Sequence, residues 1–217
     1  MSIKPILFHT DMVREILDGR KTVTRRLIKP QPDEKHQTPL GYITSELPPC
    51  GDLGKFVFGI DEYGGHLHCV KPPCQKGDNL YIRETWQYLY ELDGNEQIIE
   101  GTGKYYYAAT DTLPFDTYVD SMGVRHERVP WHPSIHMPKE AARIWLKVKN
   151  VRVERLRDID DAQLRKEGFI PEVQGHFKFK WTWNSTIKKS DLDRCGWDAN
   201  PWVWVIEFER CEKPEEF

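Results

Sequence analysis

The chain has 217 residues, of which 39% are hydrophobic and 30% charged, and its formal net charge is −3. This balance is typical of an ordinary globular protein. Because there is no run of 18 apolar residues and no signal-peptide pattern, a membrane protein is excluded and we expect a soluble, cytoplasmic monomer.

The first elements follow from local patterns. Residues 4–8 form a short apolar run that predicts a strand. Thr10 is a suitable N-cap for a helix over 11–18, whose apolar residues recur at helical spacing, and Gly19 is placed to end it. The alternating, β-branched segment 22–28 predicts a second strand.

Proline and glycine dominate residues 30–54, which predicts a long loop or insertion and not a second domain. Residues 56–61 and 67–71 are expected to pair as a hairpin. A strong alternating pattern predicts one continuous strand over 79–88, and a further strand is expected at 105–110.

Residues 113–130 show no regular pattern, and the two prolines of 132–138 predict a fixed loop. A single helical turn is expected at 139–142 and a long strand at 143–153. The next helix ends at Gly168, with Asp158 or Asp160 as its cap.

The segment 177–187 fits both periods, since its aromatic residues alternate and also recur four apart. We favour a helix because the segment ends in polar, unbranched residues. Residues 202–209 predict the last strand. Several short strands, few helices and no β-α-β rhythm predict an α+β fold, a mixed, partly closed β-barrel with a few flanking helices, formed by one domain over 1–217.

The five cysteines, at an odd count and irregular spacing, argue against a disulfide framework and predict free thiols in a reducing cytosol. His66, His68, Cys69 and Cys74 match no standard zinc spacing. We therefore expect no metal site and no cofactor.

Positive charge is concentrated in two segments. Residues 1–30 hold seven basic and three acidic side chains, and residues 135–157 hold seven basic and two acidic ones. Such asymmetry suits a phosphate-bearing partner such as RNA. Ordinary solvated faces of strands and helices would give the same composition.

The densest polar cluster lies where the first helix ends and a strand begins. If Lys21 belongs to the turn that Gly19 allows, it can approach Thr24 on the following strand. A second polar cluster spans 81–86, where Glu84 shares a strand face with Ile82 and would point inward. A carboxylate in that position needs a partner, for which Lys21 and Arg26 are candidates.

These segments carry a family resemblance. Gly19-x-Lys21-x-x-x-x-Arg26 resembles the GxKxxxxR signature of the ASCH family, which has a PUA-like barrel fold. Tyr81 to Trp86 resembles the family's strand with an inward glutamate. The other likenesses are to its phage and prophage branch: Lys4–Phe8, Met12–Arg14, Ile16–Arg26, Trp131–Pro138 and Trp197–Phe208. The resemblance leaves out insertions near 30–75 and 88–128.

The resemblance implies work on a nucleoside, a nucleotide or RNA. One subgroup hydrolyses the acetamide of N4-acetylcytidine nucleosides, which makes Lys21 the proton acceptor, Thr24 the nucleophile and Glu84 the proton donor by position. A hydroxyl nucleophile of this kind needs a neighbouring base. The expected substrate-binding residues are Arg20, Arg26, Arg83, Trp86, His132, Ser134 and His136.

Three other functions remain compatible with the sequence. PUA-like folds often bind RNA without catalysis, some ASCH groups are ribonucleases, and a phage protein can be structural. Tryptophans such as Trp181 could stack on bases, although most tryptophans at this spacing belong to the core.

Overall fold

A computed structural model describes residues 2–44, 53–91, 93–95, 97–114, 118–119, 122, 124–126 and 129–215. The fold is α+β, with 23% helix and 32% strand in several sheets. The chain divides into two compact units. The first unit comprises Met1–Ser2, Arg20–Asp78 and Lys147–Glu209, and the second comprises Ile3–Gly19, Asn79–Leu146 and Arg210–Phe217. One domain over 1–217 stays a prediction.

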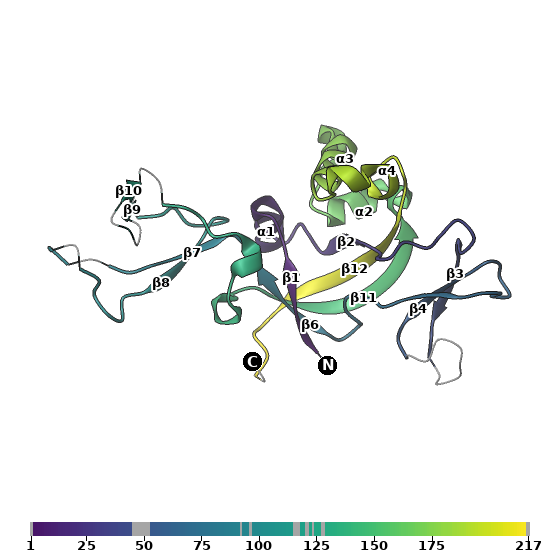
Figure 1. Ribbon diagram of the computed structural model, residues 1–217, viewed down its shortest axis with the longest axis horizontal. Coiled ribbons are helices and arrows are strands. Elements are labelled where there is room, and N and C mark those ends of the chain that lie inside the picture. The colour runs from purple at the N-terminus through teal and green to yellow at the C-terminus, as the bar shows by residue number, and fades with distance from the viewer. Residues whose placement is uncertain are drawn as a thin grey trace. The chain divides into compact units, whose positions relative to one another are not determined.

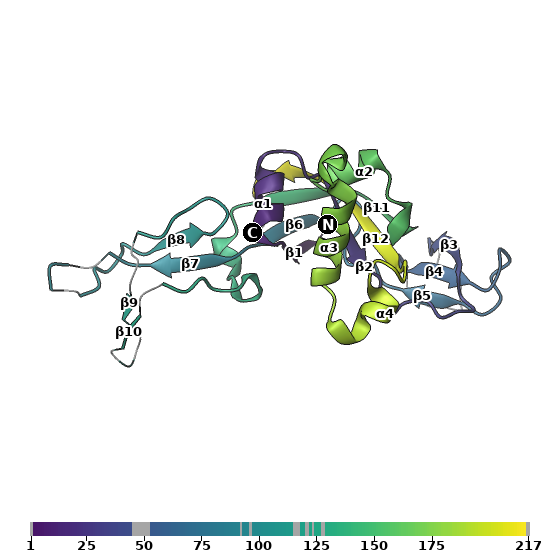
Figure 2. The same cartoon turned by 90° about the horizontal axis from the view of Figure 1, so that it is seen from above.

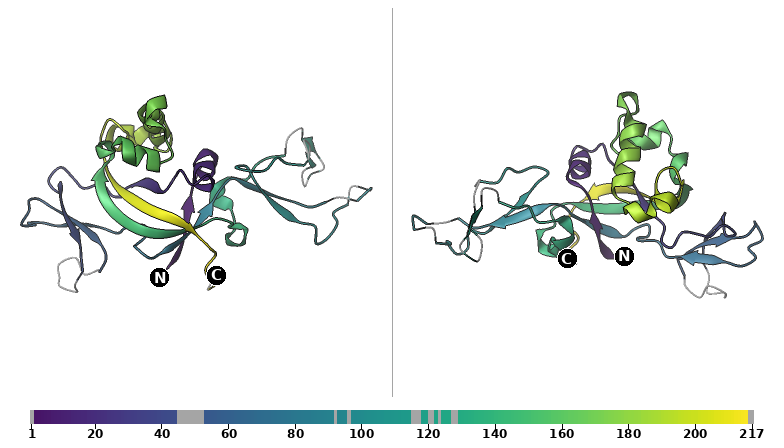
Figure 3. Two further views of the ribbon diagram at one scale, coloured as in Figure 1. Left: turned by 180° about the vertical axis from the view of Figure 1, so that it is seen from behind. Right: turned by 45° about the horizontal axis from the view of Figure 1, so that its top comes forward.

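The first unit is built on three strands: β2 (Val23–Leu27), β11 (Trp145–Arg155) and β12 (Trp202–Cys211). β2 pairs antiparallel with β12, and β11 is the other neighbour of β12. In the left view of Figure 3 the green β11 and the yellow β12 run side by side and bend together. The strands expected at 22–28, 143–153 and 202–209 are therefore confirmed, with shifts of one or two residues at several of their ends.

Helices follow β11 in the first unit: η3 (Leu156–Asp158), α2 (Asp161–Lys166), η4 (Pro171–Val173), α3 (Gly175–Ser185), η5 (Lys189–Asp191) and α4 (Leu192–Cys195). Asp160 caps α2, because its carboxylate accepts the backbone N–H of Gln163 at 2.7 Å. The ambiguous aromatic segment is helical in α3. Figure 1 shows α2, α3 and α4 gathered on one side of β2 and β12.

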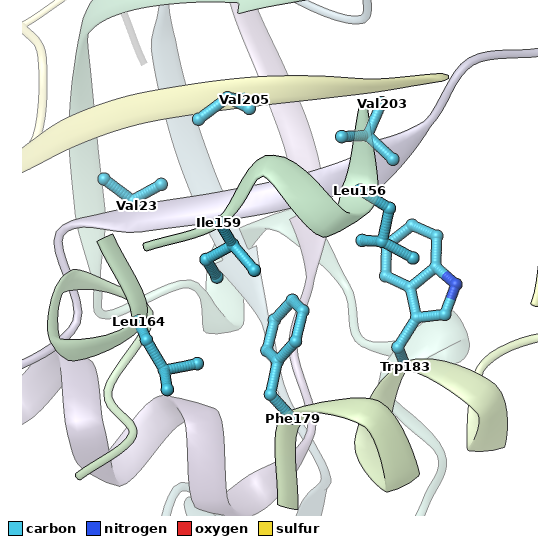
Figure 4. Close-up of a cluster of buried hydrophobic side chains, with 8 residues drawn as sticks. All are labelled: Val23, Leu156, Ile159, Leu164, Phe179, Trp183, Val203 and Val205. Atoms are coloured by element: carbon cyan, nitrogen blue, oxygen red, sulfur yellow. The ribbon is translucent and has the colours of Figure 1, made fainter. Parts of the chain in front are cut away.

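A buried apolar cluster joins these helices to the sheet (Figure 4). Val23, Val203 and Val205 point from β2 and β12 toward side chains of the helical segment. The helical side contributes Leu156, Ile159, Leu164, Phe179 and Trp183. Side chains from one face of the strands, two residues apart, thus pack against side chains from one face of the helices.

A separate three-stranded sheet occupies the predicted insertion of the first unit (Figure 2). It consists of β3 (Thr38–Tyr42), β4 (Phe56–Gly59) and β5 (His68–Val70), all antiparallel. The hairpin expected at 56–61 and 67–71 is confirmed. The loop expected over 30–54 is wrong at β3, where the backbone pairs with β4; residues 45–52 lie outside the described residues.

The second unit contains β1 (Ile3–Leu7) paired in parallel with β6 (Asn79–Arg83), and the helix α1 (Thr10–Leu17) between them in sequence. A two-stranded ribbon follows, formed by β7 (Trp86–Leu89) and β8 (Lys104–Tyr107). The short elements are β9 (Tyr118–Val119), β10 (Arg125–His126), η1 (Ser134–His136) and η2 (Lys139–Ala141). β9 and β10 pair within a segment that we expected to be irregular.

The strand expected over 79–88 is interrupted at Glu84. β6 pairs with β1 up to Arg83, whereas β7 begins at Trp86 and pairs with β8. At the break, the backbone N–H of Glu84 faces the sulfur of Met137 at 3.1 Å. The chain therefore changes pairing partner at this residue, and simple alternation does not run from Ile82 to Trp86.

A closed barrel is not found among the described residues. β3, β4 and β5 form a sheet of their own, and β8 pairs with β7 alone. The expectation of a mixed α+β fold is confirmed, and that of a barrel is not. Within the part of the chain that the structure describes, no helix is long and apolar enough to cross a membrane.

The two aromatic faces of α3 give a matched test of this core. Phe179 is 4% exposed and Phe177 is 67% exposed. Phe179→Ala should lower the free energy of unfolding by about 3–5 kcal/mol, because it leaves a cavity in the cluster. Phe177→Ala should change it by less than about 0.5 kcal/mol. Urea unfolding of both variants checks this, and equal effects would contradict the assigned rotation of α3.

Candidate functional site

Lys21 and Thr24 belong to the first unit and Glu84 to the second, so each half of the predicted site is described with its own neighbours. Gly19 ends the first helical segment with a φ of +75°, which agrees with its expected role. Lys21 then forms an isolated antiparallel bridge with Glu167, just beyond α2. Convergence of the three residues stays a prediction.

Glu167 holds Lys21 inside the first unit. The Lys21 Nζ donates to the Glu167 carboxylate at 2.5 Å and to the Glu167 carbonyl oxygen at 3.0 Å. The side chain of Lys21 is 0% exposed and that of Glu167 is 3% exposed. Because a lone buried charge is expensive, this pairing is what permits both side chains to be buried.

Arg25 completes the charge cluster. Its Nη1 lies 3.2 Å from Glu167 Oε1, and its Nη2 lies 3.1 Å from Glu154 Oε2 and donates to Gln163 as well. The Arg25 side chain is 1% exposed, and its Nε is buried without a hydrogen-bond partner among the described residues. Two cations therefore share the single carboxylate of Glu167.

The pKa of Lys21 is lowered from its ordinary value, chiefly by burial. Glu167 opposes this shift, whereas the positive charges of Arg26 and Arg25 add to it. Burial also lowers the pKa of Arg26. A lysine of this kind gives up its proton more readily than one in water, which is the property that a general base requires.

Thr24 is 3% exposed and pairs across the sheet with Ile206. Strand alternation turns Thr24 to the face opposite Val23 and Arg25. Val23 packs under the helices, and Arg25 reaches Glu167 on that same side. In the first unit the Glu167 cluster thus brings Lys21 together with Arg25, while Thr24 faces the other way.

Glu84 is held by Arg143 in the second unit. Arg143 Nε donates to Glu84 Oε1 and Nη2 donates to Oε2, both at 2.9 Å. The Glu84 side chain is 1% exposed and that of Arg143 is 29% exposed. This is a two-pronged guanidinium–carboxylate pair, which fixes orientation as well as charge. The inward direction expected for Glu84 agrees with its burial.

Arg143 is fixed on two further sides. Its guanidinium lies 3.9 Å from the ring centroid of Tyr107, and its Nη1 donates to Thr110 Oγ1 at 2.9 Å. The Tyr107 hydroxyl in turn donates to the Ala141 carbonyl at 2.7 Å. Burial, followed by the nearby carboxylates, raises the pKa of Tyr107 to about 12, although Arg143 opposes the shift.

Two predicted binding residues meet beside this cluster. The Trp86 and His132 rings lie 5.0 Å apart, and their backbones form an antiparallel bridge. His132 is exposed and Trp86 is partly exposed, while the indole N–H of Trp86 is buried without a partner among the described residues. Trp86 also sits directly across the ribbon from Tyr107.

The other predicted binding residues are less closely grouped. Arg83 Nε donates to the Met137 carbonyl at 2.7 Å. This hydrogen bond holds the loop that precedes η2. Ser134 and His136 form η1, whose residue His136 is exposed. Arg20 is exposed in the first unit, and Arg26 is only partly exposed.

Sequence reasoning missed Glu167, Arg143 and Tyr107. Glu167 and Arg143 would have passed as solvated residues, because a charged residue near a helix or strand end carries no local sign of burial. The one available signal was indirect: two inward charges, Lys21 and Glu84, each required a partner of opposite sign.

The cysteines and histidines form no centre within the described parts of the chain. There, no group of three or more His, Cys, Asp or Glu side chains is arranged to hold a metal ion. Cys74, Cys195 and Cys211 form no disulfide, but Cys69 is disulfide-bonded, so the expectation of free thiols throughout is wrong. Cys50 lies outside the described residues.

Comparison of this chain with family models, with curated proteins and with solved structures gave no match.

The titration of Tyr107 tests the packing around Arg143. Because its folded pKa of about 12 lies above the ordinary value near 10, the neutral phenol contributes stability in full below about pH 10. That contribution should fall between about pH 10 and about pH 12. Tyr107→Phe should remove this fall, as measured by urea unfolding across that range. Phenolate absorbance showing that Tyr107 ionises near its ordinary pKa would contradict the described contacts.

Proposed function

We propose that this protein is an ASCH-type, PUA-like protein that binds a nucleotide or a short RNA through the second unit. The binding groups are Arg143, Trp86 and His132, and Glu84 and Tyr107 hold Arg143 in place. The observation that carries the proposal is the state of Arg143. It is a cation fixed on a buried carboxylate and on an aromatic ring, and it is still 29% exposed.

Donor counting supports this role. A guanidinium has five N–H donors, and Arg143 uses one on Nε, one on Nη2 and one on Nη1. Each terminal nitrogen therefore keeps one N–H that meets no acceptor among the described residues. The remaining N–H donors of a rigid guanidinium are suited to the oxygens of a phosphate.

The neighbouring rings supply a surface for the base. His132 is exposed beside Trp86, and Trp86 lies across from the tyrosine on which Arg143 stacks. Nucleobases stack on aromatic side chains and on histidine. A phosphate on Arg143 and a base near Trp86 and His132 would thus use adjacent groups of one unit.

The proposal gives Glu84 a positioning role. The resemblance makes this residue a proton donor, yet both of its oxygens accept hydrogen bonds from Arg143. A protonated carboxyl could accept only one of these bonds well. Glu84 in this proposal orients the guanidinium and neutralises it, so that the outer donors keep a fixed direction.

Binding of cytidine and its 5′-monophosphate tests the proposal by calorimetry. The monophosphate should bind more tightly than the nucleoside, because only it reaches the Arg143 donors. Arg143→Lys keeps the charge and loses the fork, and should weaken monophosphate binding by roughly 10- to 100-fold while leaving nucleoside binding unchanged.

Two variants make that experiment specific. Trp86→Ala should weaken binding of both ligands alike, since it removes stacking and not the phosphate contact. Lys149→Gln removes an exposed positive charge of the first unit, paired with Glu209, and should alter neither affinity. If wild-type protein binds the nucleoside and the monophosphate equally well, Arg143 is not a phosphate ligand.

Hydrolysis of an acylated nucleoside is the second candidate function, and the lowered pKa of Lys21 favours it. In this reaction Lys21 would take the proton of the Thr24 hydroxyl, whose oxygen attacks the amide carbonyl. The C–N bond then breaks, the cytosine amine leaves with the proton from Lys21, and water hydrolyses the acetyl-threonine ester to acetate. The opposite strand faces of Thr24 and Arg25 require that the Lys21 amine leave Glu167 or act from an altered conformation.

Thr24→Val and Thr24→Ser separate this reaction from binding. The valine variant keeps the shape and lacks the hydroxyl, so release of acetate from N4-acetylcytidine should be abolished. The serine variant retains a hydroxyl and should keep measurable turnover. Circular dichroism of both variants controls for folding, and undiminished turnover by Thr24→Val would exclude Thr24 as the nucleophile.

A further inference from the structure

Helix α3 presents large aromatic side chains on two faces. Phe179 and Trp183 are 4% and 7% exposed within the core cluster, whereas Phe177 and Trp181 are 67% and 68% exposed. A folded protein can leave a single apolar side chain in water without consequence, but two large adjacent rings indicate a contact surface. The nucleotide site of the second unit does not use them.

The buried face holds the helix in place. The Phe179 ring contacts those of Phe169 and Trp197, with centroids 5.4 Å and 5.8 Å apart, and the Trp183 indole N–H donates to the Cys195 carbonyl at 2.9 Å. Figure 4 shows Phe179 and Trp183 pointing from α3 into the cluster. Phe177 and Trp181 are four residues apart and therefore neighbours on the outer face of the helix. The Cβ atoms of such a pair lie about 5–6 Å apart.

The sequence before and after the exposed rings is rich in lysine. Residues 165–189 contain six basic and two acidic side chains, and both acidic ones are already paired: Glu167 inside the unit, and Glu172 with Arg165. Lys180 pairs with Asp198. Four exposed lysines make no ion pair among the described residues: Lys166, Lys178, Lys188 and Lys189.

We propose that the outer face of α3 binds single-stranded nucleic acid. Bases would stack on Phe177 and Trp181, and phosphates would meet the unpaired lysines on either side. Aromatic rings inside a positively charged surface are the arrangement that binds single strands without sequence preference. This surface lies wholly in the first unit and stands independently of the nucleotide site proposed above.

A protein partner is the competing occupant, because Ile170 and Val173 extend the exposed apolar surface. The charge decides between the two. Lysine is depleted in protein–protein interfaces, whereas unpaired lysines are what a phosphate backbone requires. The four lysines therefore favour a polyanion as the occupant.

Fluorescence anisotropy with a labelled 12-nucleotide oligouridylate tests the inference. Trp181→Ala should raise the Kd roughly 5- to 100-fold, as expected when one stacked base is lost. Trp181→Tyr should retain most of the affinity. Trp181→Leu should lose it, because leucine keeps the apolar surface but has no ring to stack on. All three substitutions are at one exposed position, so unfolding midpoints should not change.

Salt dependence tests the lysines. Replacing Lys178, Lys188 and Lys189 together by glutamine should weaken oligonucleotide binding. It should also flatten the plot of log K against log salt by about 0.7 for each lost phosphate contact on a single strand. Lys149→Gln, which removes one exposed charge elsewhere in the first unit, should leave the slope unchanged.

Three outcomes would overturn the inference. The wild-type protein does not bind the oligonucleotide, Trp181→Ala binds it as tightly as the wild type, or Trp181→Leu binds it as tightly as the wild type. The last result would indicate an apolar protein partner. Arg143→Lys keeps the two proposals apart. This variant should weaken cytidine monophosphate binding and leave oligonucleotide binding unchanged. If it weakens oligonucleotide binding instead, the oligonucleotide does not bind at α3 and the inference is wrong.

Discussion

The first unit depends on the neutralisation of Glu167 in its interior. This carboxylate follows α2, and its partners Lys21 and Arg25 come from the other end of the sequence, 146 and 142 residues away. Removing one member of a buried ion pair typically costs about 3–5 kcal/mol, because it leaves a charge without a partner. The pairing therefore fixes where α2 lies on β2, and the adjacent backbone bond from Thr22 to Lys166 continues the same contact.

Elements that depend on local sequence could be predicted, and features that depend on distant partners could not. The strand at Trp202–Cys211 and the helix at Thr10–Leu17 have strong local periodicity, so the sequence predicts them within two residues or so at each end. The interruption at Glu84 had no local signal. It depends on β8, which pairs with the chain from Trp86 onward, and on Met137, whose sulfur faces the Glu84 backbone N–H. A barrel is not confirmed by the described residues, and β-propensity alone does not specify the partner of a strand.

Candidate site residues were predictable one at a time and not as pairs. The burial of Lys21 and Glu84 agrees with the inward directions that their positions predicted. Their partners, Glu167 and Arg143, were missed because a buried and a solvated charged residue look alike in a sequence. The residues around Glu84 and those around Lys21 differ in their exposure to solvent. Arg143 and His132 meet solvent, so a ligand can reach them directly, whereas access to Lys21 requires the first unit to open.

The paired aromatics of α3 raise a question of fold specificity. Hydrophobicity alone does not choose which pair is buried, since Phe177 and Trp181 repeat the residue types and spacing of Phe179 and Trp183. Two features make the choice. Only Trp183 reaches the Cys195 carbonyl, and a side chain at Gly175 would come within 2.5 Å of the Ile170 carbonyl oxygen. A glycine and one indole hydrogen bond thereby favour the native rotation of α3 over one that would bury Phe177 and Trp181 instead.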